Sequence, residues 1–570
     1  MTIMHLKPFP GRYIPWLLCI ALSLFFLQDI LVVQLPRLSV DSLEALFESF
    51  MPGALDWSML LLFSGLALLG LHDVRQTRHA ILRNYPVSGH IRFVFEKFRP
   101  EIRQYLIESD RDKVPFSYQQ RVLVYRRAKN LPATQAFGSI IDPYQTGYEW
   151  LMQSLAPIPH PDPATLRVMV GGADCTQPYS LSIFNISAMS YGSLSANAIM
   201  ALNKGAHMGG FAHDTGEGSV SAFHERHGGD LIWEIGSGYF GCRTKEGRFD
   251  PERFAEVAAR PQIKMIEIKL SQGAKPAHGG VLPAAKITPE IARTRGIPMD
   301  QDCISPADHS AFKTPLELLQ FIQKLRRLSN GKPVGFKLCI GRMTEWFALV
   351  KAMLASGIRP DFIVVDGSEG GTGAAPVEFA DHIGMPLRDA LRLVHASLVG
   401  AGLRDEIRIG ASGKIISAFD IMRVCALGAD WANSARGFMF ALGCIQSRTC
   451  DTNRCPTGVA TQDPSRQQAL DPADKGVRVA NFHRNTIMGV CELLGATGLT
   501  HTRQVTPSRI LVRGISGRPE NLAHALLNLR KGDLLGEEAA AKLDQYVPGL
   551  GIAWQHADPT VWHETKKFNN

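Results

Sequence analysis

Cysteine is scarce in this sequence. Only 10 of the 570 residues are cysteine, and seven of them occur singly. Single, scattered cysteines do not form the paired framework that stabilises small secreted domains. This absence predicts a protein of a reducing compartment whose thiols stay free. The seven are Cys19, Cys175, Cys242, Cys303, Cys339, Cys425 and Cys491.

Charge is also sparse, at 20% of residues, although the formal net charge is +8. The sequence has no basic patch interleaved with aromatic residues, so we predict no nucleic-acid partner. The basic residues instead gather directly after an apolar N-terminal region, which is typical of contact with anionic lipid. A chain of 570 residues can hold one large core of roughly 250–350 residues plus attached segments.

The other three cysteines, Cys444, Cys450 and Cys455, form one dense group with the spacing C-x5-C-x4-C. Thiolates gathered in one loop commonly hold iron and sulfide. A structural zinc site needs four Cys or His ligands, and no histidine lies between Leu442 and Gln462. Three thiolates therefore suit an iron–sulfur cluster that lacks one corner iron. Structural thiols that lie close by coincidence are the alternative.

From Leu181 onward, short apolar runs alternate with longer amphipathic segments such as 314–328 and 344–354. This alternation predicts parallel βαβ units with right-handed connections. The span of roughly 250 residues is the usual size of a (β/α)8 barrel of the TIM type, and a doubly wound open sheet is the alternative. The predicted strands are residues 181–186, 210–213, 265–270, 334–338, 362–365, 408–411 and 431–435.

Two apolar runs, 13–35 and 53–71, precede the barrel region. Each reaches the length of roughly 20 residues that a membrane span requires, although Asp29 and Asp56 interrupt them. No small-residue cleavage site follows the first run before Pro36, which argues against a cleaved signal peptide. We therefore predict an N-terminal two-helix transmembrane hairpin.

Basic residues give this hairpin an orientation. They are frequent outside the two runs, whereas the loop 36–52 holds only Arg37 together with three acidic residues. Because cytoplasmic flanks carry the excess of Lys and Arg, both ends of the hairpin and the catalytic region are predicted to lie in the cytoplasm, at the inner membrane. The flanking basic residues are Lys7, Arg12, Arg75, Arg78, Arg83, Arg92, Lys97 and Arg99.

Six sequence runs occur in the order in which they are found in a known family. Over roughly residues 140–510 the chain resembles the FMN-binding synthase domain of the glutamate synthase large subunit, and its cysteine run resembles the 3Fe-4S segment of that domain. The resemblance implies a (β/α)8 barrel with FMN and a 3Fe-4S cluster held by the three cysteines. The runs are SAMSYGSLS (187–195), DTGEGS (214–219), IKLSQGAKPAHGGVLP (268–283), GFKLCIG (335–341), DGSEGGTGAAP (366–376) and GC-x5-C-x4-CPTGVATQ (443–462).

Four regions are predicted along the chain. The membrane hairpin occupies residues 1–73, and a basic connector, 74–150, packs on the barrel or else presents a solvated basic face to the membrane. The FMN-binding synthase domain follows at 151–510, with the iron–sulfur loop at 444–455. Residues 511–570 form a C-terminal helical tail.

The loops that follow the strands of a (β/α)8 barrel carry its chemistry. Small residues there allow backbone to lie along a flavin ring, and glycines late in the barrel expose backbone N–H groups to a phosphate. Glycines that only turn the chain are the alternative. The expected FMN contacts are Ser187, Ala188, Met189, Ser190, Lys337, Asp366, Gly370, Gly371, Gly373, Gly413 and Gly437.

Lys269 and Lys337 each end an apolar strand, where a solvated lysine would be out of place. A bound dicarboxylate or reduced flavin would supply the partner charge, and an internal ion pair with Glu267 or Asp366 is the alternative. By the resemblance, the reaction is reductive amination of 2-oxoglutarate with ammonia to glutamate. The residues expected to hold substrate or order a proton are Glu217, Lys269, Gln272, Lys275 and Lys337.

The sequence departs from the family pattern at several points. It has no amidotransferase domain with an N-terminal cysteine, so we expect external ammonia and an external electron donor, either ferredoxin or a pyridine-nucleotide subunit. His278 replaces an acidic residue of the family's KPGEGG run, and a histidine-rich loop is shortened at 304–310. These changes leave two alternatives open. One is a flavin oxidoreductase that acts on another oxo or hydroxy acid and couples to a membrane electron carrier, and the other is a non-catalytic redox sensor.

Overall fold

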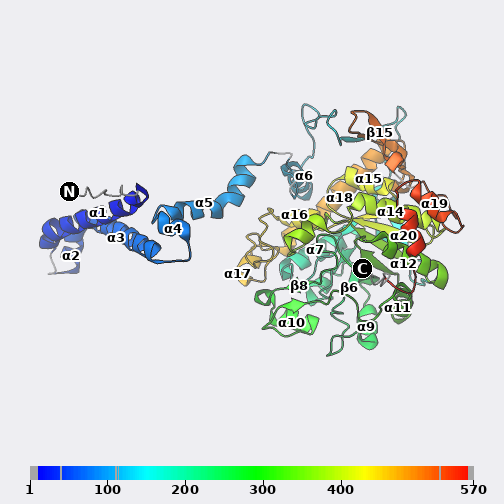
Figure 1. Ribbon diagram of the computed structural model, residues 1–570, viewed down its shortest axis with the longest axis horizontal. Coiled ribbons are helices and arrows are strands. Elements are labelled where there is room, and N and C mark those ends of the chain that lie inside the picture. The colour runs from blue at the N-terminus through cyan, green and yellow to red at the C-terminus, as the bar shows by residue number, and fades with distance from the viewer. Residues whose placement is uncertain (1–10, 39–41, 110–111, 113–114, 526–527, 563–570) are drawn as a thin grey trace, which may run out of the picture. The chain divides into compact units, whose positions relative to one another are not determined.

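The computed structural model describes residues 11–38, 42–109, 112, 115–525 and 528–562 (Figure 1). The chain divides into two compact units, Met1–Ser109 and Asp110–Asn570. Lys7, which the predicted membrane orientation uses, lies outside the described residues.

The first unit is built on two apolar helices that pack against each other. Helix α1 spans Ile14–Asp29 and continues through the π-helical turn η2, Ile30–Gln34, while α3 spans Ala54–Arg75. The stretches Gly11–Arg37 and Met51–Arg75 are long and apolar enough to cross a membrane by length and composition. Three polar contacts join them in antiparallel order. These are Trp16 to the Ala67 carbonyl at 2.9 Å, Ser23 to Ser64 at 2.7 Å, and Gln34 to Asp56 at 3.1 Å.

Short helical segments complete this unit. Helix α2, Leu43–Phe50, lies between the two apolar helices in sequence, and Ser42 caps it by accepting a hydrogen bond from the Ala45 N–H. Three further segments follow α3, namely α4 (Ala80–Asn84), α5 (Gly89–Ile102) and the π-helical η5 (Arg103–Ile107).

The second unit contains a closed barrel of eight parallel strands within the described residues, in the order β4-β5-β6-β7-β10-β11-β12-β13. This confirms the predicted (β/α)8 fold, and the open-sheet alternative is wrong. Seven of the strands overlap the predicted runs, but β6 was not among them. The strands are β4 (Phe184–Ile186), β5 (His213–Asp214), β6 (Leu231–Ile235), β7 (Ile263–Lys269), β10 (Val334–Leu338), β11 (Phe362–Asp366), β12 (Arg408–Ser412) and β13 (Trp431–Ser434).

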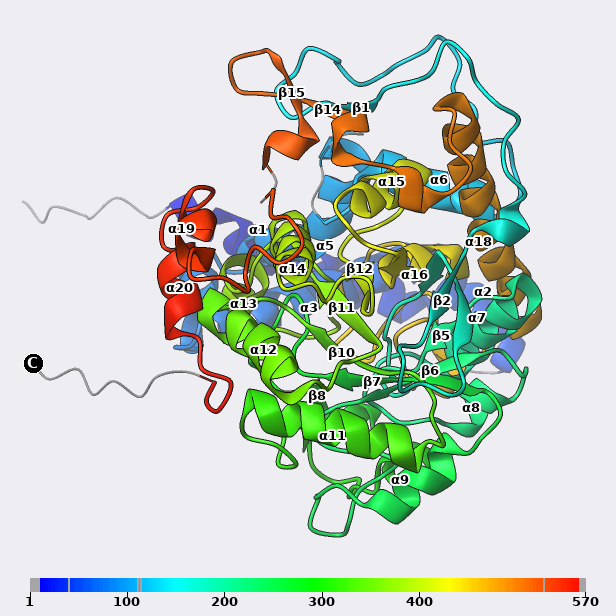
Figure 2. The same ribbon diagram turned by 90° about the vertical axis from the view of Figure 1, so that its right-hand side faces the viewer.

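Helices follow the strands and surround the barrel (Figure 2). The connection between β7 and the next barrel strand, β10, is the longest between barrel strands, and we call it the excursion after β7. It contains the two-stranded sheet β8–β9 (Val281–Leu282 and Cys303–Ile304). The helices are α7 (Ala196–Gly209), α8 (Ala222–Glu225), α9 (Pro251–Ala258), α10 (Pro289–Arg295), α11 (Pro315–Leu328), α12 (Met343–Ser356), α13 (Val377–His382), α14 (Leu387–Gly400), α15 (Ala418–Ala426), α16 (Arg436–Leu442), α17 (Pro464–Gln467) and α18 (Pro472–Ala496).

Helix α11 shows how local sequence produces these elements. Thr314 caps it by accepting a hydrogen bond from the Glu317 N–H, and Pro315 fits the first turn, where its missing N–H costs nothing. Leu318, Ile322 and neighbouring apolar residues recur at helical spacing and are buried. Each such side chain contributes roughly 1.5–3 kcal/mol through burial.

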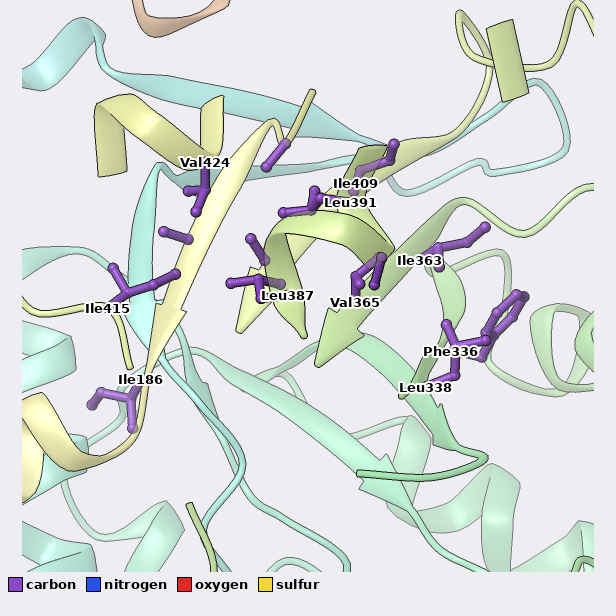
Figure 3. Packing of buried hydrophobic residues seen from close by; sticks show 14 of the residues in the cluster. Ile186, Phe336, Leu338, Ile363, Val365, Leu387, Leu391, Ile409, Ile415 and Val424 are labelled. Atoms are coloured by element: carbon purple, nitrogen blue, oxygen red, sulfur yellow. The ribbon is translucent and has the colours of Figure 1, made fainter. Parts of the chain in front are cut away.

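Two apolar layers hold the barrel. The outer layer lies between strands and helices, and Figure 3 shows Leu387 and Leu391 of α14 beside Val365 and Ile409 of the strands. The inner layer fills the floor of the barrel, where the antiparallel hairpin β2–β3 (Arg167–Val170 and Tyr179–Ser182) contributes buried side chains. Its members are Val170, Leu181, Ala212, Ile232, Met265, Phe362, Val364 and Trp431.

Segments before and after the barrel strands also join the second unit. Helix α6, Tyr118–Ala128, packs on α16 and α18, and β1, Glu149–Leu151, pairs with β14, Ile510–Arg513. Strand β15, Pro519–Asn521, extends this small antiparallel sheet. The last described helices are α19, Ala539–Asp544, and α20, Leu550–His556, the latter packed on α12.

Gly410 of β12 provides a test of the inner layer. A Cβ at this position would lie 2.6 Å from Cε2 of Trp431, a fully buried ring with no room to move. We expect Gly410→Ala to destabilise the folded protein by about 1–3 kcal/mol through overpacking. Gly341→Ala is the matched control, because a Cβ there meets no atom within 4 Å. Thermal unfolding of both variants in detergent measures the difference, and equal midpoints would contradict the packing argument.

Candidate active site

Polar side chains occupy the barrel interior above the apolar floor. Residues two apart on a strand share a face. Ile232 and Met265 belong to the apolar inner layer, so Glu234 and Glu267, two residues further along the same strands, also face the interior. We call this buried group the interior polar layer. Its members are Asp214, Glu234, Glu267, Lys337, Asp366 and Ser412.

Lys337 is the cation of the interior polar layer. Its ammonium is paired with Glu234 and lies 3.3 Å from Glu267 Oε1. Burial alone would lower the pKa of Lys337, but the surrounding carboxyls outweigh burial and raise it. Burial, followed by Glu234, raises the pKa of Asp214 to about 7, and burial, followed by Asp214, raises the pKa of Glu267 well above its usual value. Several carboxyls therefore share one ammonium, and the layer retains protons near neutral pH.

A second ion pair lies closer to the mouth of the barrel. The Lys269 ammonium is 3.1 Å from Glu217 Oε1, and both side chains are largely buried. Burial works against the charge of Glu217, but Lys269, then Arg295 and Lys275, outweigh it and lower the pKa of that carboxyl. Burial, followed by Lys269, lowers the pKa of Lys275. The sequence left an internal ion pair with Glu267 or Asp366 as the alternative for the two strand-end lysines. Lys337 makes such a pair with Glu267, whereas the partner of Lys269 is Glu217, which was not among the expected ones.

A cavity of about 140 Å³ opens above these pairs. Arg295 and Lys286 add two buried cations to its wall. Most of the residues predicted from the sequence meet here. They are Ser187, Ala188, Met189, Ser190, Glu217, Lys269, Gln272, Lys275, Lys337, Asp366, Gly371 and Gly373.

A second cavity, of about 360 Å³, adjoins the first and shares Thr372, Arg436 and other residues of its wall. It contains the remaining predicted glycines, Gly370, Gly413 and Gly437. Gly413 has φ +151°, a conformation that side chains rarely adopt, and a Cβ on Gly437 would lie 2.5 Å from Ser434 Oγ. Bare backbone at these two turns fits a phosphate-bearing planar cofactor that extends from one cavity to the other.

The three-cysteine loop forms one wall of the second cavity, and Cys450 also lines the first. Helix α6 holds the start of this loop, because Tyr125 donates to the Cys444 carbonyl at 2.6 Å. Burial raises the pKa of Cys444 to about 11. Burial also opposes the Cys455 thiolate, but hydrogen bonds from Thr457 and from backbone N–H groups outweigh it and lower the pKa of Cys455.

The spacing of these sulfurs bears on the metal they could hold. Among the described residues, ligand atoms of three Cys, His or carboxyl groups gather within 4.8 Å of one another at Asp214, Glu234 and Glu267, and the cysteine loop is not such a group. The three sulfurs therefore do not converge on the position of a single ion. At the cluster of Asp214, Glu234 and Glu267, the Lys337 ammonium already supplies the positive charge that a metal ion would bring.

Four charged residues of the first cavity wall and the interior polar layer were not predicted from the sequence. Asp214 and Glu234 belong to short strands, and Glu234 lies in β6, an apolar run with one acidic residue whose burial could have drawn attention to it. Arg295 and Lys286 come from the excursion after β7, and no local pattern connects them with the cavity. Lys286 donates to the carbonyls of Ser193 at 2.9 Å, Cys450 at 3.2 Å and Ala460 at 3.4 Å.

Comparison with known proteins adds independent findings. Residues 164–500 match the family model described as the conserved region in glutamate synthase. The glutamate synthase large subunit-like protein YerD of Bacillus subtilis is 37% identical over 511 residues, which cover 81% of this chain and 96% of YerD. The archaeal glutamate synthase (NADPH) of Methanocaldococcus jannaschii is 36% identical over 358 residues, which cover 63% of this chain but only 65% of that protein.

Solved structures with a similar chain trace include a mandelate oxidase variant, with a TM-score of 0.37 at 16% identity, covering 63% of this chain and 86% of that one. A variant of flavocytochrome b2 has a TM-score of 0.37 at 11% identity, covering 78% of this chain and 90% of that one.

The interior polar layer makes a specific stability prediction. Lys337→Met leaves the buried carboxyls without their cation and should cost about 3–5 kcal/mol of unfolding free energy. Because burial raises the folded-state pKa of Asp214 to about 7 and raises that of Glu267 as well, these groups favour folding most when protonated. The deficit should therefore be smallest below about pH 4 and should grow as the pH rises toward 7.

Denaturant unfolding at pH 4.5 and pH 7.5, values chosen at about the two ends of this window, measures the effect. Adding Glu234→Gln to Lys337→Met removes one competing carboxylate and should recover part of the loss. A deficit that is the same at both pH values, with no recovery in the double variant, would show that Lys337 does not balance this charge.

Proposed function

Because the chain belongs to the glutamate synthase family, a family of oxidoreductases acting on CH–NH2 donors, we propose that it is a glutamate synthase dependent on FMN and a 3Fe-4S cluster. The proposed reaction is reductive amination of 2-oxoglutarate to glutamate. Ammonia is supplied from outside the chain, and electrons come from ferredoxin or from a pyridine-nucleotide subunit.

One observation carries this proposal. Arg436 and Cys450 lie in the walls of both cavities, so the cysteine loop adjoins the cavity that holds the buried lysines. A cavity lined by cations suits a dicarboxylate substrate, and a cysteine loop at its wall suits electron delivery over a short distance. This combination favours a reductive step on an anionic small molecule.

The cations of the first cavity would bind and orient the substrate. Lys269, Lys275 and Arg295 can each donate to a carboxylate, and charge-assisted hydrogen bonds of this kind are the stronger ones. A bound dicarboxylate competes with Glu217 for the Lys269 ammonium. Glu217 would then be released to order the nitrogen of the imine or to hold its proton, with Gln272 as the neutral donor beside it.

The cofactors would occupy the adjoining surfaces. FMN would lie along Ser187–Ser190, Lys337, Asp366 and the glycines of the two cavities, and the cluster would be bound by Cys444, Cys450 and Cys455. When bound, FMN supplies a hydride to C2 of the 2-imino acid, and the cluster relays single electrons to the flavin. The Lys337 ammonium would supply positive charge to the bound flavin, and the apolar floor would limit the access of water from below.

The N-terminal unit would attach this chemistry to a membrane. The two apolar helices have the required length and composition. Basic residues on the outer flanks favour a cytoplasmic position for both ends and for the catalytic unit. We retain the hairpin at 1–73, the connector at 74–150, the synthase domain at 151–510 and the tail at 511–570 as the proposed organisation.

A second candidate is an oxidoreductase for a different oxo acid. His278 lines a small cavity beside Glu217 and Gln272, and its Nδ1 lies 2.9 Å from the Gly279 carbonyl. An imidazole here, where the family has an acidic residue, changes the charge next to the proposed proton-handling group. A change of substrate would follow from that difference.

Flavin reoxidation tests the proposed reaction. Dithionite-reduced protein, kept anaerobic in detergent, should regain the oxidised flavin spectrum when 2-oxoglutarate and ammonium are added together. One glutamate should form for each flavin that is reoxidised. Lys269→Met should slow this step about 10- to 100-fold, because a charged hydrogen bond to the substrate is lost. Lys264→Met is the matched control, since Lys264 lies on the same strand, is half-exposed and pairs with Asp230.

Reoxidation by another oxo acid but not by 2-oxoglutarate with ammonium would favour the second candidate. Reoxidation by no acceptor in the protein with both cofactors bound would favour a redox sensor.

Iron content tests the cysteine assignment separately. Cys450→Ser should lower iron and acid-labile sulfide per chain to near zero while FMN is retained, because a cluster with three protein ligands tolerates the loss of a thiolate poorly. Cys175→Ser is the control and should keep the full iron content. Its thiol is partly buried and donates a hydrogen bond to the Gly331 carbonyl. Full iron in the Cys450 variant would remove this residue from the ligand set.

A further inference from the structure

The segment after the second apolar helix forms an amphipathic helix. Helix α5 and the π-helical η5 run without a break from Gly89 to Ile107. Seven large apolar side chains on it are exposed, with values such as 62% for Phe95 and 80% for Leu106. Ile107, the last residue of the segment, lies apart from the other six. Their spacing of three, four or seven residues places them on one stripe. The apolar stripe comprises Ile91, Val94, Phe95, Phe98, Tyr105 and Leu106.

Basic residues border this apolar stripe along one side. At helical spacing, Arg92, Arg99 and Arg103 follow this edge, whereas the other edge carries the acidic Glu101, with Lys97 further round the helix. The segment has four basic and two acidic residues, and one of the acids, Glu96, is paired with Arg92 at 2.8 Å. An exposed apolar stripe beside a face of net positive charge is the pattern of helices that lie in the surface of an anionic bilayer.

The start of this helix is tied to the end of α3. Asp73, in the last turn of α3, is fully buried, and both of its carboxylate oxygens lie 2.9 Å from His90 Nε2. The same carboxylate accepts the Val87 N–H at 3.0 Å. On the side away from the apolar stripe, Phe93 packs edge-on against His79 at 6.0 Å. The amphipathic helix therefore begins where the apolar span ends (Figure 1).

We propose that residues 89–107 bind the anionic surface of the same bilayer that α1 and α3 cross, with the apolar stripe inserted among the headgroups. This proposal rests on the membrane attachment proposed above. Continuity with α3 selects the bilayer as the occupant, because a helix that starts at the end of a span starts at headgroup depth. The row of arginines beside the apolar stripe and the net positive charge of the segment match an anionic leaflet.

Depth-dependent quenching tests the proposal in the full-length chain. The protein is reconstituted in vesicles of phosphatidylcholine with phosphatidylglycerol, and a fluorescent non-natural amino acid replaces Phe95, Phe98 or Glu96 singly. Since such helices insert roughly 5–10 Å, a shallow nitroxide lipid should quench the probes at Phe95 and Phe98 about threefold more than the probe at Glu96. Arg99→Glu with Arg103→Glu should reduce quenching at Phe95, as should removal of phosphatidylglycerol.

A probe at Leu61, an exposed residue in the middle of α3, separates the two levels of the proposal. Strong quenching at Leu61 by a deep nitroxide, with equal quenching at Phe95 and Glu96, would overturn the surface-helix inference and leave the membrane span intact. Quenching at none of these positions would overturn both. Quenching at Phe95 that is unchanged by phosphatidylglycerol or by the charge reversals would exclude recognition of the anionic headgroup.

Discussion

The ammonium of Lys337 is the contact on which the barrel interior depends. Burying one carboxyl in a protein is costly, and this barrel buries several within a few ångströms of one another. A single cation and retained protons make that arrangement tolerable. The apolar floor below confines the charge to the upper part of the barrel, so the floor stabilises the fold and the upper part is available for chemistry. The same strands contribute to both parts, because the floor residues Ile232 and Met265 are followed two residues later by Glu234 and Glu267 of the polar layer.

Much of this arrangement could be predicted from the sequence. Short apolar runs between amphipathic segments identified seven barrel strands, because buried parallel strands are nearly uniform in character. The strand that was missed, β6, carries Glu234 and Trp233 in a run of only five residues. Most predicted site residues followed directly from their positions at strand ends, and the lining of the two cavities contains them. The dense cysteine spacing was equally visible as a local pattern.

The rest arises from contacts between distant segments. Arg295 and Lys286 come from the long excursion after β7, and nothing in their neighbouring residues indicates a cavity wall. Helix α6 and the residue Phe116 just before it support the cysteine loop from more than 300 residues away in the chain. Tyr125 of α6 donates to the Cys444 carbonyl, and the Gln446 side chain hydrogen-bonds both backbone groups of Phe116. Such pairings depend on how the closed barrel places its loops, and a single sequence has no periodicity that reports them. The pairing of both strand-end lysines with carboxyls also required the assembled interior.

Lys286 has a consequence for local unfolding. Its three ammonium protons match three carbonyls, which belong to the loop after β4, to the cysteine loop and to the segment that follows the cysteines. If any one of these segments moves away, the buried Lys286 ammonium loses one of its three hydrogen-bond acceptors. The free-energy cost of that loss also destabilises the arrangement of the other two segments. The three segments should therefore open and close as one cooperative unit. Hydrogen exchange in the cysteine loop would then report the integrity of the substrate wall, although no side chain of the loop needs to touch a substrate.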